Sequence, residues 1–250
     1  MFFFKSTCVC SFKKHQKLFV MKTKLLFLTF VFSLFLTGQK NPYSEWIKET
    51  RTNIRLIPEY GDTHLSPQIR ENDRKAISRY FPNTSMDKAS EQLINTGFSY
   101  ITKGDLKTAM YRFNQAWLLT PENENVFWGF GTVYFIFLDY DKALLYYNKG
   151  LTLNPEHPNL LTDKATVYLS KFYKERNKDH LNRAKDLLLQ SYTLDTTNVN
   201  TLFKLSGSYF FDLDCENAVK YFTQCEDLGG QPITNEYRET LTKKCIQEYN

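Results

Sequence analysis

The chain has 250 residues, of which 42% are hydrophobic and 16% aromatic, which is enough apolar material for a packed core and excludes a disordered polymer. The formal charge is +5, but six lysines lie in residues 1–38, which contain no acid, so the remainder carries 26 basic residues against 27 acidic ones. Binding of phosphate backbones needs a clustered basic surface in the folded part, so we expect no nucleic-acid partner.

Residues 1–38 have the order of a secretory signal peptide. An uncharged apolar run at 25–36 follows Met21, Lys22 and Lys24, and it ends at the small residues Thr37 and Gly38. The run is shorter than the roughly 20 residues that a membrane-spanning helix needs. We therefore predict a cleaved leader and export to the periplasm or cell envelope, with Met21 as a candidate true start. The alternative is an uncleaved signal anchor, which would be the only contact with a membrane.

Three cysteines lie outside the leader, so at most one disulfide can form within the exported chain. We expect the pair to be Cys225 and Cys245, because adjacent helices would bring them together. The alternative is that these cysteines are small buried hydrophobic residues.

Residues 39–89 form a polar N-terminal segment with one predicted amphipathic helix. Ser66 and Pro67 provide a cap and first turn for a helix that carries Ile69 and Ile77. We expect this helix to cover the open face of the region that follows, and residues 41–63 to be extended or loosely docked.

An internal repeat with a period of 34 residues begins near residue 90. Six slots occupied by small, aromatic or proline residues are filled twice. The first set is Gly97, Tyr100, Ala109, Phe113, Ala116 and Pro121, and the second is Gly131, Tyr134, Ala143, Tyr147, Gly150 and Pro155. The small residues let two helices approach closely, and the prolines end the second helix of each unit.

This order of residues resembles the tetratricopeptide repeat. The resemblance implies an all-α, right-handed solenoid of helix-turn-helix units. We place four repeats at 90–123, 124–157, 158–198 and 199–233, with seven inserted residues between the two helices of the third. A capping helix at 234–250 would cover the last repeat.

In that family the first helices of the repeats line a concave groove that holds a partner segment. The resemblance places apolar and aromatic side chains in the groove, which suits an apolar peptide or helix. The alternative for several of these rings is packing against neighbouring helices. The predicted groove residues are Ile94, Phe98, Ile101, Asn125, Trp128, Phe135, Asn159, Thr166, Asn200, Phe203 and Phe210.

Asn125, Asn159 and Asn200 occupy equivalent places near the starts of three first helices. They form either a ladder of amides for a partner's backbone or, as we favour, a set of helix N-caps. The third-repeat insertion, residues 171–178, mixes basic and aromatic side chains. It is interpreted as a solvated helix extension, with a second contact site as the alternative.

No arrangement of residues suggests catalysis. The four histidines lie apart from Cys or acidic companions at metal-ligand spacing, and no glycine-rich phosphate loop or nucleophile elbow is found. We expect no enzyme activity, metal or cofactor. The leading hypothesis is an exported protein-binding scaffold, and the alternative is a structural subunit of an envelope complex that self-associates or docks through the insertion. A sugar-binding or hydrolase-accessory role has only the abundance of aromatic residues in its favour.

Overall fold

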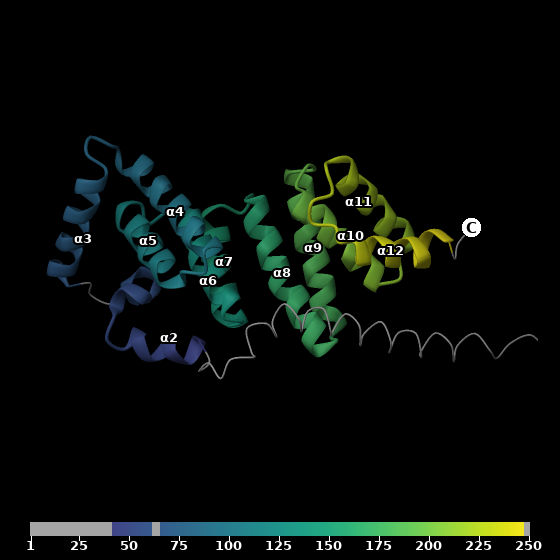
Figure 1. Ribbon diagram of the computed structural model, residues 1–250, viewed down its shortest axis with the longest axis horizontal. Coiled ribbons are helices and arrows are strands. Elements are labelled where there is room, and N and C mark those ends of the chain that lie inside the picture. The colour runs from purple at the N-terminus through teal and green to yellow at the C-terminus, as the bar shows by residue number, and fades with distance from the viewer. Residues whose placement is uncertain (1–41, 62–65, 248–250) are drawn as a thin grey trace, which may run out of the picture. The chain divides into compact units, whose positions relative to one another are not determined.

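The computed structural model describes residues 42–61 and 66–247, and every regular element in these ranges is helical. Helix pairs follow one another along the chain, each packed against the next (Figure 1). The pairs are α4 (Met86–Thr102) with α5 (Leu106–Leu119), α6 (Glu124–Ile136) with α7 (Tyr140–Leu153), α8 (Pro158–Glu175) with α9 (Lys178–Leu194), and α10 (Val199–Phe211) with α11 (Cys215–Asp227). The predicted all-α solenoid of helical hairpins is confirmed. The helices of the described ranges include none that is long and apolar enough to cross a membrane.

The turns within the hairpins share one construction. Asp105, Asp139 and Asp214 precede the second helices of the first, second and fourth pairs, and each carboxylate accepts an N–H from the first turn. The residue before each aspartate has a positive φ, which Gly104 adopts without strain. Leu138 and Leu213 adopt the same conformation with φ of 62° and 63°. A left-handed leucine costs roughly 1–2 kcal/mol, so these two turns are held by the helices around them.

The third hairpin is longer than the others. α8 has 18 residues and α9 has 17, against 13 and 14 in the second pair. The seven additional residues therefore lengthen both helices instead of forming a loop. Arg176 ends α8 in the left-handed conformation, and Asn177 caps α9.

Close packing between helices rests on aromatic rings that lie against glycine backbone. The Phe113 ring on α5 is fully buried, and a Cβ built on either Gly97 or Gly129 would lie 2.5 or 2.4 Å from it. Tyr147 has the same relation to Gly131, where a Cβ would lie 2.4 Å from the ring. Each ring therefore occupies space that the Cβ of any residue other than glycine would fill.

The N-terminal segment is more ordered than the sequence suggested. Where one helix was expected, the structure has α2 (Pro42–Thr50), the 3₁₀ segments η1 (Ile54–Leu56) and η2 (Pro58–Gly61), and α3 (Pro67–Tyr80). The expectation of an extended or loosely docked segment was therefore wrong. The chain divides into two compact units at Lys48, and the repeats lie wholly in the second unit.

A buried asparagine holds the 3₁₀ segments against the first repeat. The Asn114 side chain on α5 donates to the carbonyls of Arg55 at 2.8 Å and Ile57 at 2.9 Å, and it accepts the N–H of Tyr60. Glu59 also forms a 2.5 Å ion pair with Lys149 on α7. The Asn114 side chain thus provides hydrogen-bond partners for carbonyl and N–H groups of this 3₁₀ region, which lie outside any α-helix or sheet.

α3 begins at Pro67 as predicted, but the Ser66 side chain makes no capping hydrogen bond. The helix packs against α5, the second helix of the first repeat. Its buried Asp73 accepts hydrogen bonds from the Arg55 guanidinium and from the Tyr60 hydroxyl, the latter at 2.6 Å. Burial and the Asp73 contact raise the pKa of Tyr60 well above its usual value, so its hydroxyl stays protonated and donates.

The C-terminal segment covers the fourth repeat. α12 (Asn235–Leu241) begins at the cap Thr234 and continues into the π-helical turn η3 (Thr242–Gln247). The Tyr237 hydroxyl bonds to Ser206 on α10 at 2.6 Å, and Leu241 packs with Phe222 of α11.

The disulfide differs from the prediction. Cys215 and Cys245 are bonded, with Cα atoms 5.1 Å apart, and Cys225 is a buried free thiol. The pairing of Cys225 with Cys245 was wrong because the two cysteines of α11 lie on different faces. Cys215 faces the capping segment, whereas Cys225 packs in the cluster formed by α9 and α10, with its sulfur 3.5 Å from the Val199 carbonyl.

The glycine contacts lead to a matched pair of substitutions. Gly131→Ala forces the Tyr147 ring to move and is expected to lower the free energy of unfolding by about 1–3 kcal/mol, the usual cost of overpacking. Gly207→Ala is the control, because a Cβ there meets nothing within 4 Å. It should leave stability unchanged or raise it by up to about 1 kcal/mol. Urea unfolding followed by circular dichroism measures both, and equal effects would contradict the packing role of Gly131.

Candidate functional site

The first helices of the last three repeats begin at side-chain caps. Asn123, His157 and Asn198 each accept a backbone N–H from the first turn of α6, α8 or α10. The sequence favoured Asn125, Asn159 and Asn200 for this role, which was wrong by two residues. These three lie within the first turn of their helices, where a side chain points back toward the helix start but is not the cap.

Two of these asparagines instead connect the start of one first helix to the cap of the next. Asn125 bonds to the His157 ring at 3.0 Å, and Asn159 accepts from Asn198 at 2.7 Å. Because His157 Nδ1 accepts the Leu160 N–H, its Nε2 carries the proton and donates to Asn125. Burial lowers the pKa of His157, which keeps the ring neutral at pH 7. The amides of Asn125 and Asn159 are therefore engaged within the chain, and Asn200 is exposed.

One side chain from each first helix contributes to a continuous row, which we call the first-helix row: Phe98 (α4), Trp128 (α6), Asp163 (α8) and Lys204 (α10). The rings of Phe98 and Trp128 lie 4.6 Å apart between centroids. Trp128 Nε1 donates to Asp163 Oδ2 at 2.7 Å, and Asp163 and Lys204 interact through their charges. The row joins all four repeats through aromatic, hydrogen-bonding and electrostatic contacts in turn.

The charges in the row are shifted by their surroundings. Desolvation raises the pKa of Asp163, and the Trp128 N–H, the charge of Lys204 and, once its ring is protonated, His157 partly offset the shift. Desolvation lowers the pKa of Lys204, and the charge of Asp163 opposes this. Each group is therefore costly to ionise alone and is stabilised by the other.

Asp163 and Lys204 were not among the predicted residues. They occupy the same slot of the repeat once the seven inserted residues are counted, and Gly129 fills that slot in the second repeat. Opposite charges in equivalent positions of neighbouring first helices could have predicted this pair from the sequence, but the groove residues were chosen mainly for their apolar and aromatic character.

The other predicted groove residues on the first three repeats differ in exposure. Ile94 is only 5% exposed and belongs to the core, because it faces the neighbouring helices, so it is removed from the candidate surface. Ile101 and Phe135 are half-buried on α4 and α6. Thr166 is half-buried on α8, and its hydroxyl donates to the carbonyl of Thr162 at 2.8 Å.

The two predicted aromatic residues of the fourth repeat, Phe203 and Phe210, are half-buried and contact the capping segment. Both rings pack edge-on against Tyr237 of α12, with centroids 5.5 and 6.0 Å away. Part of each ring therefore serves packing, which is the alternative that the sequence left open.

The insertion contributes both to packing and to the exposed surface. Phe172 is buried, and its ring lies 5.6 Å from that of Phe211 on α10. Residues 173–179 are exposed, and Lys171 pairs with Asp141 at 3.0 Å. Across the described ranges, no three His, Cys, Asp or Glu side chains form a group that could hold a metal ion.

No protein-family model and no curated protein matches this sequence. Among solved structures, pilF of Pseudomonas aeruginosa is 16% identical over 66% of this chain and 72% of its own, with a TM-score of 0.56. TTC0263, a thermophilic TPR protein of Thermus thermophilus, is 15% identical over 64% and 82%, with a TM-score of 0.53. The Cut9–Hcn1 hetero-tetramer of APC/C is 15% identical over 76% and 35%, with a TM-score of 0.51. At these identities the likeness concerns the fold, which is of the tetratricopeptide type, as the 34-residue repeat predicted.

The Trp128–Asp163 hydrogen bond leads to a pH-dependent prediction. Trp128→Phe removes the N–H that stabilises the carboxylate, so the pKa of Asp163 should rise further. The variant should lose about 2 kcal/mol at pH 7, the scale of a hydrogen bond to a charged group. Because the folded pKa lies above the unfolded value of 3.8, ionisation of Asp163 destabilises the fold as pH rises through that window, and protonation at lower pH removes most of the difference.

Asp163→Asn provides the control for that experiment. In this background Trp128→Phe should cost only a neutral hydrogen bond to the oxygen of the substituted amide and the packing that the smaller ring loses, with no dependence on pH between 4 and 7. Urea unfolding of the two single variants and the double variant at several pH values measures the coupling. An unchanged pH dependence in Asp163→Asn would show that another group is responsible.

Proposed function

We propose that the protein is a binding scaffold whose first helices hold an apolar peptide or helix of a protein partner. One observation carries the proposal. Phe98 and Trp128 on successive first helices are half-buried and lie 4.6 Å apart between ring centroids, and Phe135 on α6 is half-buried as well. Large rings exposed together offer contact area at low entropic cost, which is typical of binding surfaces.

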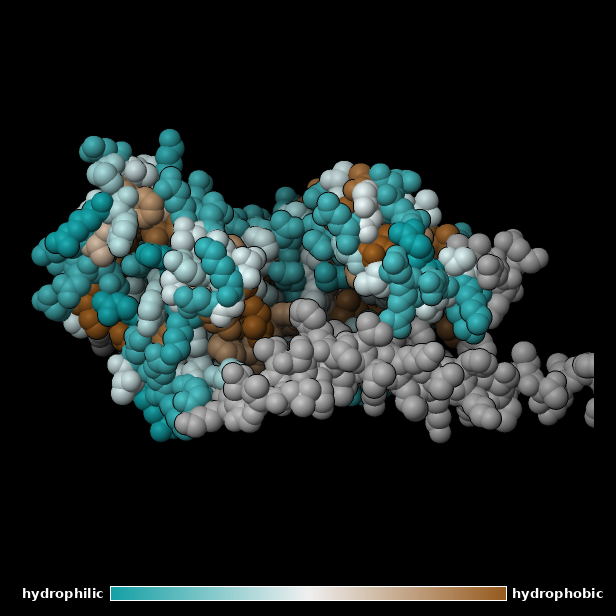
Figure 2. Space-filling view, viewed as in Figure 1, coloured by the Kyte–Doolittle hydropathy of each residue, from teal (hydrophilic) through white to brown (hydrophobic). Residues whose placement is uncertain are grey.

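The surface is not uniformly apolar. Asp163 and Lys204 lie within the first-helix row, so a partner that covers the row also meets one negative and one positive charge. Figure 2 shows hydrophobic residues gathered near the turn between α6 and α7, where Ile136 and Leu138 are 43% and 56% exposed. An apolar segment with a polar residue near its centre suits this combination.

Phe135 and Leu145 allow a matched test of this surface. A peptide selected from a phage-displayed library against the purified protein should be rich in apolar residues. Phe135→Ala should weaken its binding at least about tenfold, the effect of losing a central contact of roughly 1.4 kcal/mol. Leu145→Ala removes an apolar side chain that is 50% exposed on the second helix α7 and should leave the affinity unchanged. Fluorescence anisotropy gives both dissociation constants.

Equal weakening by the two substitutions, or by neither, would exclude the first helices as the binding surface. Thermal unfolding of both variants checks that the fold is kept. If the library gives no binding peptide and the protein sediments as an oligomer, self-association becomes the better explanation.

The alternative function, assembly through the insertion, has weaker support. Tyr173 is 40% exposed, but its ring and that of Phe172 both contact Phe211, so the aromatic part of the insertion is used within the chain. What remains exposed is mainly charged, as expected for a solvated helix extension.

The disulfide supports the proposal that the protein is exported. Disulfides persist in oxidising compartments and are rare in the cytosol. Cys215 and Cys245 are bonded across the junction between α11 and the capping segment. The predicted leader, residues 1–38, lies outside the described residues, so its cleavage is proposed from the sequence.

Counting thiols tests export and cleavage together. Protein from its native source, unfolded without reductant and labelled with a maleimide, should carry one label, on Cys225, because Cys8 and Cys10 leave with the leader. Intact mass should place the N-terminus near Gln39. Three labelled thiols from Cys215, Cys225 and Cys245 would contradict the oxidising compartment, and a mass that includes residues 21–38 would contradict cleavage.

A further inference from the structure

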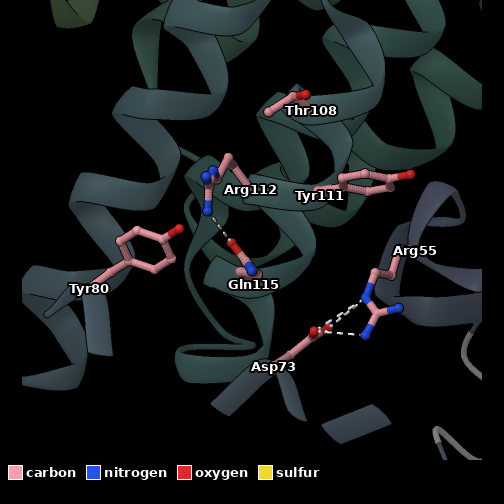
Figure 3. A pocket seen from close by; sticks show the side chains of 7 residues that line it. All are labelled: Arg55, Asp73, Tyr80, Thr108, Tyr111, Arg112 and Gln115. Atoms are coloured by element: carbon pink, nitrogen blue, oxygen red, sulfur yellow. Dashed lines mark hydrogen bonds and ion pairs between the residues drawn. The ribbon is translucent and has the colours of Figure 1, made fainter. Parts of the chain in front are cut away.

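A cleft of about 290 Å³ lies between the N-terminal segment and the first repeat. Its walls come from η1, α3 and α5, and none of the first helices contributes to it. Figure 3 shows Arg112 and Gln115 of α5 on one side, with Tyr80 of α3 nearby and the Arg55–Asp73 pair on the other side. The cleft therefore contains two arginines and one carboxylate.

The two arginines are in different situations. Arg55 is neutralised, since its Nε and Nη2 donate to Asp73 at 3.2 and 2.9 Å. Asp73 also accepts the Tyr60 hydroxyl at 2.6 Å, so its oxygens are well supplied with donors. Asp73 is thus committed to Arg55 and Tyr60 and is not available to Arg112.

Arg112 has no acidic partner in the part of the chain that the structure describes. Its Nη1 donates to the neutral Gln115 side chain at 2.9 Å, and the Tyr80 ring lies over the guanidinium with its centroid 5.8 Å away. Its Nε is buried and has no hydrogen-bond partner. A buried donor without an acceptor is costly, so Nε is the guanidinium group that an additional acceptor would satisfy.

We propose that this cleft binds a carboxylate through Arg112, on a ligand about the size of one amino-acid residue. A planar carboxylate matches the two-donor edge of a guanidinium and brings the negative charge that Arg112 lacks as a partner. The volume is near the lower limit of ligand pockets, roughly 300 Å³. The rings of Tyr80 and Tyr111 line the cleft and offer contact to an apolar body attached to the carboxylate.

Tyr80 controls access to the buried donor. The residue is the last of α3 and is 70% exposed, so its side chain can turn aside with little loss of packing. A carboxylate that enters beside the ring then supplies the acceptor that Arg112 Nε lacks. The proposal is independent of the first-helix surface, because no residue is shared between the two.

N-acetyl-leucine and its C-terminal amide form a matched pair of probes, since they differ only in the carboxylate. The experiment follows the Arg112 Nε–H resonance of the whole protein by NMR during titration with each probe and with inorganic phosphate. We expect N-acetyl-leucine to shift this resonance in a saturable manner and the amide to have no effect. Arg112→Lys, which keeps the charge but not the planar fork, should weaken binding at least tenfold, as judged from the Tyr80 and Tyr111 ring signals.

Arg79→Gln is the control for net charge, because Arg79 is exposed on α3 and does not line the cleft. It should bind N-acetyl-leucine as the unchanged protein does, and backbone NMR spectra check that all variants are folded. Four results would each overturn the proposal. The amide could bind as tightly as N-acetyl-leucine, or Arg79→Gln could weaken binding as much as Arg112→Lys does. Arg112→Lys could bind N-acetyl-leucine with full affinity, or the Arg112 resonance could shift with phosphate and not with N-acetyl-leucine.

Discussion

The close approach of the Phe113 ring to glycine backbone is the contact on which the rest of the structure depends. One ring occupies the space left by Gly97 of its own repeat and by Gly129 of the next, so it determines both the spacing within a hairpin and the spacing between hairpins. Packed interiors have few voids, so neither distance can change without displacing the ring. The first helices are thereby brought near enough for Phe98, Trp128 and Asp163 to touch in sequence.

The later repeats use polar contacts at the corresponding seam. Hydroxyls of Thr162, Ser191 and Thr201 are fully buried and bond to one another at 2.6–3.0 Å, and Ser191 also donates to the Pro158 carbonyl. A buried hydroxyl cluster is stabilising only when each member finds a partner. The third repeat is thus joined to the fourth by these directional contacts and by the apolar cluster that includes Leu188, Leu202 and Leu205.

The fold was predictable because its determinants are periodic, and the features that were missed are not. Gly97 and Gly131 recur at a fixed spacing, so one sequence reveals them. The disulfide depends on which face of α11 each cysteine occupies, and the choice between Cys215 and Cys225 needs the position of the capping segment. The ordered structure of the N-terminal segment depends on Asn114, whose side chain hydrogen-bonds to backbone groups of that segment about 57 positions away in sequence. No local pattern reports such a bond.

The aromatic members of the first-helix row, Phe98 and Trp128, were predicted from the sequence, whereas the charged members, Asp163 and Lys204, were missed. The charged members restrict the partners that the proposed surface would accept. Desolvation works against ionisation of both Asp163 and Lys204, and their mutual attraction and the Trp128 N–H offset part of this cost. A purely apolar partner would exclude the remaining water and increase that cost. A partner with a donor opposite Asp163 or an acceptor opposite Lys204 would reduce it. We therefore expect the proposed binding surface to discriminate among apolar segments by the polar group they carry, since selectivity arises from the penalty for leaving a buried charge unpaired as well as from favourable packing against the rings.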